Sequence, residues 1–280
     1  MKRQLSIKKN SVLLYLFIAV LLCVVLLPFV WLLLGSFKNQ KELFTTPVQI
    51  LPSELRWENY ARVFSVQPFG SYIFNSFVTS LLTTVFVIII ASMTSYSIAR
   101  VEIRGKKLVL AALLAITLLP PVTLLNPLYM LLNRLNLLNT YLGLSISMAV
   151  VELPMAVWFL TSYFEAVPMA LEESALIDGA NTFTMFQKIL VPLLAPGIFT
   201  VSILVFINAW NNYLFAQVFN PLPQARTITV ALTLLRVDEF TIPWELTSAA
   251  AIIVTAPLVL VVLLLQKRII SGMLDGGIKG

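Results

Sequence analysis

Long apolar runs separated by short polar segments dominate this sequence. Residues 10–37, 72–99, 108–133, 189–225 and 246–266 carry no charged side chain, and residues 135–164 carry only Glu152. About 20 apolar residues cross the hydrocarbon core of a bilayer, and a backbone in hydrocarbon must pair within its own helix. The pattern therefore predicts an all-α polytopic transmembrane bundle forming a single domain over residues 1–280. It has about six spans, near 12–34, 72–98, 108–132, 137–162, 190–218 and 246–266.

The first apolar run follows a basic segment, as it would in a signal peptide. Met1–Asn10 carries four Lys and Arg side chains. However, the run is longer than the apolar region of a signal peptide, and no small-x-small cleavage site follows at residues 35–37. We therefore expect a retained membrane helix.

Positive charge predicts the orientation of the spans. Met1–Asn10, Arg100–Lys107 and the tail, with Lys267, Arg268 and Lys279, belong to alternate loops. Compact clusters of Lys and Arg stay on the cytoplasmic side. We therefore expect a multi-pass protein of the cell (inner or plasma) membrane, with lipid around its spans and both termini in the cytoplasm.

Proline interrupts several of the predicted spans. A proline removes a backbone donor and kinks a helix. Ordinary kinking of membrane helices and a bundle that bends around a pathway both fit this pattern. The prolines are Pro120, Pro121, Pro127, Pro154, Pro192, Pro196 and Pro257.

The composition excludes several kinds of chemistry. Cys23 is the only cysteine and histidine is absent, which excludes an internal disulfide, a thiolate metal cluster and imidazole catalysis. The net charge of +6 is concentrated beside the spans rather than in a patch for nucleic acid. Arg104-Gly105-Lys106-Lys107 lacks the rest of a phosphate-binding loop. We expect neither a bound cofactor nor an enzymatic site in this chain.

The loop over residues 163–189 departs from the charge pattern, because acids outnumber the single Lys188. Pro168 suits the first turn of a helix, Gly179 suits a helix end, and Asn181 can cap a second helix. The loop thus predicts a short amphipathic helix, a glycine turn and a return into the membrane. Helices that lie on a membrane surface are usually basic, so we favour a docking surface for a protein.

This loop resembles the "EAA" loop of ABC importer permeases. The match consists of Glu173-Ser174-Ala175, three residues, Gly179, nine residues and Ile189-Leu190-Val191-Pro192, with Ser174 and Val191 departing mildly from the family pattern. The segments 57–60, 177–180 and 271–280 are similar to the carbohydrate branch, in particular to the smaller permease of maltose-type importers.

The resemblance implies a machine with several subunits. Its partners would be a second homologous permease, two copies of a cytoplasmic ATPase that use ATP and Mg, and an extracellular or periplasmic solute-binding protein. Nucleic acid is not an expected partner. The tail, with Gly276, Gly277 and Lys279, would be a second ATPase contact. The ATPase-coupling residues would be Glu172, Glu173, Ser174, Ala175, Asp178, Gly179, Ile189 and Pro192.

Polar and aromatic side chains within the spans are candidates for lining a pathway, because a sugar needs hydrogen bonds and stacking faces. Polar groups in an apolar run are costly unless they have partners. The aromatic residues could instead belong to an interfacial belt, and the amides could join helices. An acid within a span is functional by default, although a structural or cavity-lining role is favoured here. The candidates are Asn126, Glu152, Asn208, Trp210 and Asn211.

Two other classes of protein compete with this interpretation. A stand-alone ion-coupled secondary transporter usually shows internal repeats; we detect none, and such a protein would leave the acidic loop unexplained. A membrane enzyme would need a catalytic constellation, which the sequence lacks.

Overall fold

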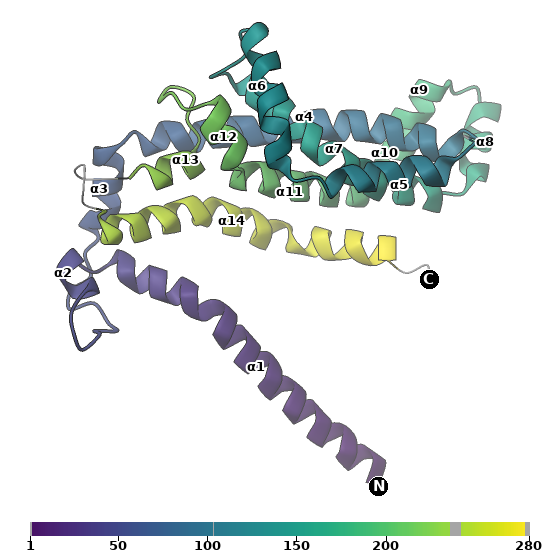
Figure 1. Cartoon of the computed structure of the whole chain (residues 1–280). Helices are drawn as coiled ribbons and strands as arrows, with labels where there is room; N and C mark the ends of the chain where they lie inside the picture. Colours follow the sequence, from purple (N-terminus) through teal and green to yellow (C-terminus); the bar gives the residue numbers. More distant parts are fainter. Residues whose placement is uncertain (1, 103, 236–241, 278–280) are drawn as a thin grey trace. The chain divides into compact units, whose positions relative to one another are not determined.

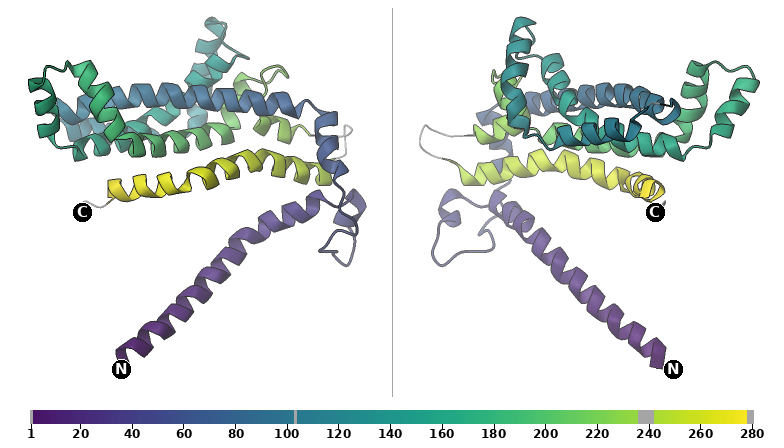
Figure 2. Two further views of the ribbon diagram at one scale, coloured as in Figure 1. Left: turned by 180° about the vertical axis from the view of Figure 1, so that it is seen from behind. Right: turned by 45° about the vertical axis from the view of Figure 1, so that its right-hand side comes forward.

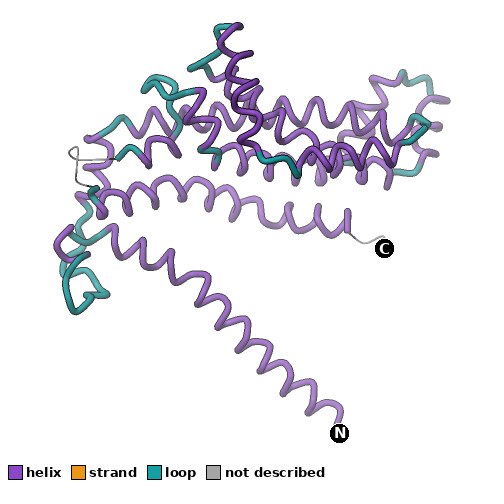
Figure 3. The backbone as a smooth tube through the Cα atoms, viewed as in Figure 1, coloured by secondary structure: helices purple, strands orange, loops and turns teal. Residues whose placement is uncertain are grey.

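The computed structural model describes residues 2–102, 104–235 and 242–277, and their side chains from residue 13 to residue 266. Within these ranges every regular element is helical (Figure 1, Figure 3), so the predicted all-α class is confirmed. The elements are α1 Lys2–Ser36, α2 Gln40–Leu43, α3 Glu58–Val66, α4 Phe69–Arg100, α5 Lys106–Thr117, a 3₁₀ turn Pro121–Leu124, α6 Leu125–Arg134, α7 Tyr141–Ala166, α8 Met169–Ile177, α9 Thr182–Met185, a π-helical turn Phe186–Leu190, α10 Val191–Leu193, α11 Ala195–Asn211, α12 Leu214–Phe219, α13 Ile228–Thr233 and α14 Trp244–Gly277.

Four helices in the described part of the chain are long and apolar enough to cross a membrane. They are Leu13–Ser36 of α1, α4, α7 and Trp244–Gln266 of α14, and the number rises to six if each of two bent helix pairs forms one span. The helices α1, α4 and α14 extend beyond the predicted spans at both ends, whereas α7 is displaced toward the C-terminus by about one turn.

The two bent pairs replace the predicted spans 108–132 and 190–218, so neither of these is one continuous helix. The helix from Lys106 and the helical segment from Pro121 meet at 91°, and Thr182–Leu193 meets Ala195–Asn211 at 77°. Consecutive prolines lie at the first break and Pro192 and Pro196 flank the second. Pro121, Pro192 and Pro196 lie at the starts of their helices. A proline suits the first turn of a helix but cannot continue the helix before it, because it lacks the N–H and clashes with the preceding turn.

The chain forms two units. The first comprises Met1–Phe69 and Leu234–Ala256, and the second comprises Gly70–Thr233 and Pro257–Gly280. In the first unit, the buried Asn59 amide of α3 donates hydrogen bonds of 2.9 Å to the carbonyls of Ser36 and Lys38. These bonds fasten the end of α1 to α3. Every side chain from Leu13 to Leu33 is exposed, so lipid or another chain must cover this apolar helix.

The core of the second unit lies between α4, α7 and α11 (Figure 2). Hydroxyl groups join α4 to α7: Ser95 donates to the Val157 carbonyl at 2.9 Å, and Ser145 donates to the Thr79 carbonyl at 3.1 Å. Small polar residues let membrane helices approach closely and hydrogen bond across their interface.

Hydrogen bonds and ion pairs define the two ends of this second unit. At one end, the Asn75 amide of α4 donates to the Arg226 carbonyl at 2.8 Å and accepts a 2.7 Å bond from Tyr141 of α7. At the other end, the last residue of α4 pairs with Glu172 of α8. The loop after α4 and the acidic loop therefore lie at the same end, as the predicted alternation of loops requires.

Candidate functional site

The acidic loop folds into a knob, which we define as residues 168–190. Its first helix, α8, follows Pro168, which takes the N-cap position with φ −60° and ψ 133°. The helix ends at Ile177, and Gly179, two residues later, has a φ of +86° in the left-handed region. Gly179 N–H donates to the Leu176 carbonyl at 3.1 Å, and Ala180 N–H donates to the Ala175 carbonyl at 3.0 Å. This pair of bonds is a Schellman motif, which confirms the predicted glycine turn.

The second half of the knob returns toward the membrane spans. The Asn181 side chain caps α9 by accepting a 2.8 Å bond from Thr184 N–H, as predicted. Met185 is buried and shares the core cluster with Ala175 of α8, so the two halves of the knob pack on each other. A π-helical turn, Phe186–Leu190, then leads into α10 and the bend before α11.

The structure separates the residues of the family-like motif into an inner and an outer set. Glu172 and Ala175 face the interior, and Ile189 is half-buried. Glu172, which the sequence placed among the ATPase-coupling residues, is therefore not exposed on the outer surface of the knob. Exposed are Glu173, Ser174, Asp178, Gly179 and Pro192.

Apolar side chains form the tip of the knob. The sequence analysis did not predict this, because it considered mainly the acidic residues of the loop. Ile177 is 86% exposed, Phe183 72% and Leu176 51%. Monomeric surfaces rarely gather apolar side chains this way, and such gatherings mark interaction sites. Apolar residues on both sides of the glycine turn were the signal in the sequence.

Arg100 anchors the knob, although the sequence counted it only in a basic cluster that orients the spans. Its Nε lies 2.5 Å from Glu172 Oε1, and the two side chains are 10% and 8% exposed. Its Nη2 also donates to the Val167 carbonyl at 3.0 Å. A second pair, Lys106 to Glu165 at 2.7 Å, is more exposed. Arg100 thus contributes structure as well as charge to the loop after α4.

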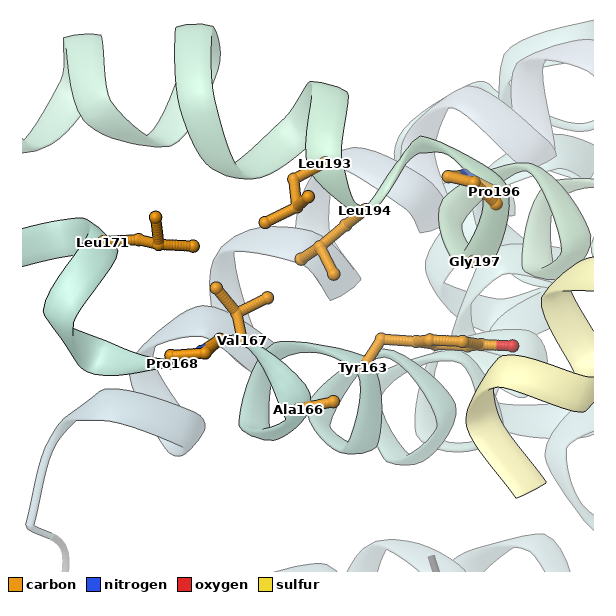
Figure 4. A pocket seen from close by; sticks show the side chains of 9 residues that line it. All are labelled: Tyr163, Ala166, Val167, Pro168, Leu171, Leu193, Leu194, Pro196 and Gly197. Carbon is orange, nitrogen blue, oxygen red and sulfur yellow. The ribbon is translucent and has the colours of Figure 1, made fainter. Parts of the chain in front are cut away.

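An apolar cavity of about 300 Å³ separates the start of the knob from the bend before α11 (Figure 4). The ring of Tyr163 lies against Gly197, where an added Cβ would come within 2.8 Å of the ring carbons. The wall is otherwise made by Ala166, Val167, Pro168, Leu171, Leu193, Leu194 and Pro196.

The candidate pathway residues fall in different environments. The Asn208 amide of α11 donates a 3.1 Å hydrogen bond to Glu152 of α7. Asn208 and Asn211 are both exposed and, three residues apart, share one face of the helix. Trp210 is only 2% exposed and stacks on Phe206 with centroids 6.1 Å apart, so it packs within the chain. Asn126 lies exposed on α6.

Two residues of the predicted tail contact lie at the end of α14. The backbone of α14 continues through Gly276 and Gly277, whereas Lys279 lies outside the described residues.

Comparisons with known proteins match most of this chain. A family model described as "Binding-protein-dependent transport system inner membrane component" matches residues 90–275. The sulfoquinovosyl glycerol transport system permease protein SmoH of Agrobacterium fabrum is 38% identical over 255 residues, covering 91% of this chain and 89% of the relative. The trehalose/maltose transport system permease protein MalG of Thermococcus litoralis is 36% identical over 265 residues, covering 94% and 95%.

The fold also matches a chain of a bacterial ABC transporter involved in the import of the acidic polysaccharide alginate. The TM-score is 0.79 at 21% identity, over 94% of this chain and 97% of that one. At this identity the likeness concerns the fold alone.

Proposed function

Because this chain belongs to the family of binding-protein-dependent transport system inner membrane components, we propose that it is the permease subunit of an ATP-driven importer of sugars or sugar derivatives. The two relatives above are named for sulfoquinovosyl glycerol and for trehalose and maltose, which supports this class of solute. The family favours this function over a stand-alone ion-coupled transporter, since such a transporter needs no ATPase subunits.

The knob carries the proposal, as the element that couples the spans to a cytoplasmic ATPase. It is stiff, because the Schellman motif at Gly179 and the Asn181 cap fix both helix ends. It has an apolar tip, Ile177 and Phe183, rimmed by the exposed Glu173. A buried apolar centre with a polar rim is the usual anatomy of a protein interface.

The remaining parts of the machine follow from the family. This chain would supply half of the translocation pathway, and a second homologous permease would supply the other half. Two copies of an ATPase would use ATP and Mg, with the tail residues Gly276, Gly277 and Lys279 as a second contact, and an external solute-binding protein would deliver the solute. With the knob and the loop after α4 in the cytoplasm, both termini would be cytoplasmic as well.

The polar face of α11 and α7 is the part of this chain that would line the pathway. Glu152, Asn208 and Asn211 offer a carboxylate and two amides, which can hydrogen bond to the hydroxyl groups of a sugar. A polar group facing lipid would lack partners, so these side chains need water, solute or a polar subunit beside them. Trp210 is a packing group rather than a pathway residue.

The test is reconstitution of the complex in proteoliposomes. We would purify this chain together with the second permease, the ATPase and the binding protein that the proposal requires, and measure ATP hydrolysis against a panel of mono- and oligosaccharides. Stimulation of hydrolysis and uptake by one sugar-loaded binding protein is expected. Uptake that follows an ion gradient without any ATPase subunit would contradict the proposal.

A further inference from the structure

We propose that Arg100 and Glu172 form the link that passes movements of the knob to α4, which makes them positioning residues for transport. This inference rests on the proposed function of the knob as the ATPase-coupling element. It goes beyond the motif match, in which Arg100 has no part and Glu172 is a coupling residue without an assigned contact.

The geometry joins three segments at one point. Arg100 is the last residue of α4, and Glu172 lies in the first turn of α8. Besides the 2.5 Å contact between them, Arg100 Nη2 donates to the carbonyl of Val167, immediately before the knob. One turn earlier on α4, the Tyr96 hydroxyl lies 3.5 Å from Glu172 Oε2. The last turns of α4 therefore hold both the entry to the knob and its first helix.

Aromatic packing extends this link to the second half of the knob. The Tyr96 ring lies 5.4 Å from that of Phe186 and 5.8 Å from that of Phe164, and Phe164 and Phe186 stack at 6.0 Å. Phe186 begins the π-helical turn after α9. Both arms of the knob thus touch Tyr96, which lies on the same helix as Arg100.

The charges of Arg100 and Glu172 match the helix ends at which they lie, and their burial makes it costly to separate them. A cation is stabilised at the C-terminus of a helix and an anion in its first turn, as Arg100 and Glu172 are. A buried pair contributes little net stability compared with apolar residues, but losing one partner is strongly unfavourable. The planar guanidinium of Arg100 is held by both the Glu172 carboxylate and the Val167 carbonyl, so it can shift little relative to either.

The contact between the start of the knob and the bend before α11 is not filled in this way. There, the cavity of about 300 Å³ separates Pro168 and Leu171 from the segment 193–197 (Figure 4). Packed interiors transmit displacement and voids do not. A push on the knob tip should therefore move α4 directly, while the bend before α11 has space to follow separately.

The experiment compares this pair with the exposed pair Lys106–Glu165, whose side chains are 27% and 47% exposed. Exposed pairs contribute little, so Glu165→Gln serves as the matched control for Glu172→Gln. Both variants would be made in the complete complex, and the readout is solute transported per ATP hydrolysed. A merely structural role would lower the yield of complex without changing this ratio.

We expect Glu172→Gln to lower the ratio by about fivefold or more, the usual range of coupling between sites, with the ATPase subunits still bound. The control should leave the ratio unchanged. The exchanged pair Arg100→Glu with Glu172→Arg should restore only part of it, because the helix ends and the Val167 carbonyl favour the original arrangement. Arg100→Lys keeps the charge but loses the several N–H donors of the guanidinium, so it should give an intermediate ratio. This variant replaces Glu172→Gln as the test if Glu172→Gln assembles poorly.

A distance measurement tests the link independently of transport. Spin labels at Met93 on α4 and Met169 on α8, both exposed and outside the knob tip, with Cys23 replaced by serine, should give one narrow distance distribution that Glu172→Gln broadens. An unchanged ratio together with an unchanged distribution would overturn the link. If the unsubstituted chain binds no ATPase, the proposed function is contradicted. The spin-label distances would still show whether the Arg100–Glu172 pair holds the knob to α4.

Discussion

The side-chain amide of Asn208 on α11 donates a 3.1 Å hydrogen bond to the carboxylate of Glu152 on α7, across 56 positions of sequence. The acid in the middle of α7 therefore has a polar partner on a neighbouring helix. Asn208 is nevertheless exposed on the chain, as is Asn211 on the same face. A bond that only joined two helices would not need a second amide left open beside it.

Asn208→Ala should therefore weaken solute uptake while leaving the complex assembled. A hydrogen bond to a charged group contributes about 1.5–3 kcal/mol, which corresponds to a loss of roughly tenfold or more in apparent affinity. The measurement is uptake against external solute concentration in proteoliposomes. If assembly fails and the uptake of the surviving complex is normal, the pair serves packing.

Trp210 provides the contrasting case on the same helix. Because its side chain is 2% exposed, Trp210→Ala should open a cavity and lower stability by about 3 kcal/mol. Thermal unfolding in detergent would show this loss, whereas apparent solute affinity in the folded fraction should stay unchanged. A variant with normal stability and weakened affinity would move Trp210 into the pathway.

The sequence predicted those features of the fold that depend on a residue and its near neighbours in the chain. Apolar runs define α1, α4, α7 and α14 because a membrane demands length and hydrophobicity. The turn at Gly179 and the cap at Asn181 were predicted because each follows from one residue and its neighbours. Side-chain chemistry likewise identified the pathway candidates by type, although not by the direction in which they face.

Other features depend on contacts between distant segments. Arg100 and Glu172 are 72 positions apart, and only the packing of α4 against the knob brings them together. The prolines predicted interruption but not its size, since whether a helix kinks or turns by 91° depends on its neighbours. The exposure of Ile177 could not be predicted for the same reason. An apolar side chain is expected to be buried, and here a partner subunit would have to bury it.

Gly179 and Gly70 form a matched pair for testing the turn. An added Cβ would meet nothing within 4 Å at either position, but only Gly179 has a positive φ, of +86°. Gly179→Ala should therefore cost about 1–2 kcal/mol of local strain and reduce coupling between hydrolysis and uptake, and Gly179→Val should reduce it further. Gly70→Ala should leave coupling normal, and equal effects at both sites would contradict the role of the turn.

Gly197 tests the wall of the cavity. A Cβ there would lie 2.8 Å from Cγ and Cδ1 of the Tyr163 ring, so Gly197→Ala should destabilise the protein by about 1–3 kcal/mol through overpacking. Replacing Tyr163 with leucine in the same chain should relieve the clash and recover part of the loss. Thermal unfolding of the single and double variants provides the measurement, and strictly additive losses would show that the contact does not matter.

Glu173→Lys tests the electrostatic part of docking. This side chain is exposed beside the knob tip, so reversing its charge should weaken ATPase binding. The effect should shrink at high salt, because charges in water are screened beyond about 10 Å at 0.1 M ionic strength. Co-purification of the ATPase at low and high salt would measure it. A defect that stays constant across salt would mean that Glu173 is buried by the partner or acts within the knob.

Ile177 tests the apolar part of docking, and its behaviour should differ from that of Glu173. The side chain is 86% exposed, and burying it fully against a partner contributes about 1.5–3 kcal/mol, so Ile177→Ala should weaken ATPase binding by roughly tenfold. Salt should not relieve this loss, because apolar burial involves no charge. Leu222→Ala, at an exposed leucine on the opposite end of the second unit, is the control and should bind the ATPase normally. If both variants retain full binding, the apolar tip of the knob is not the docking surface.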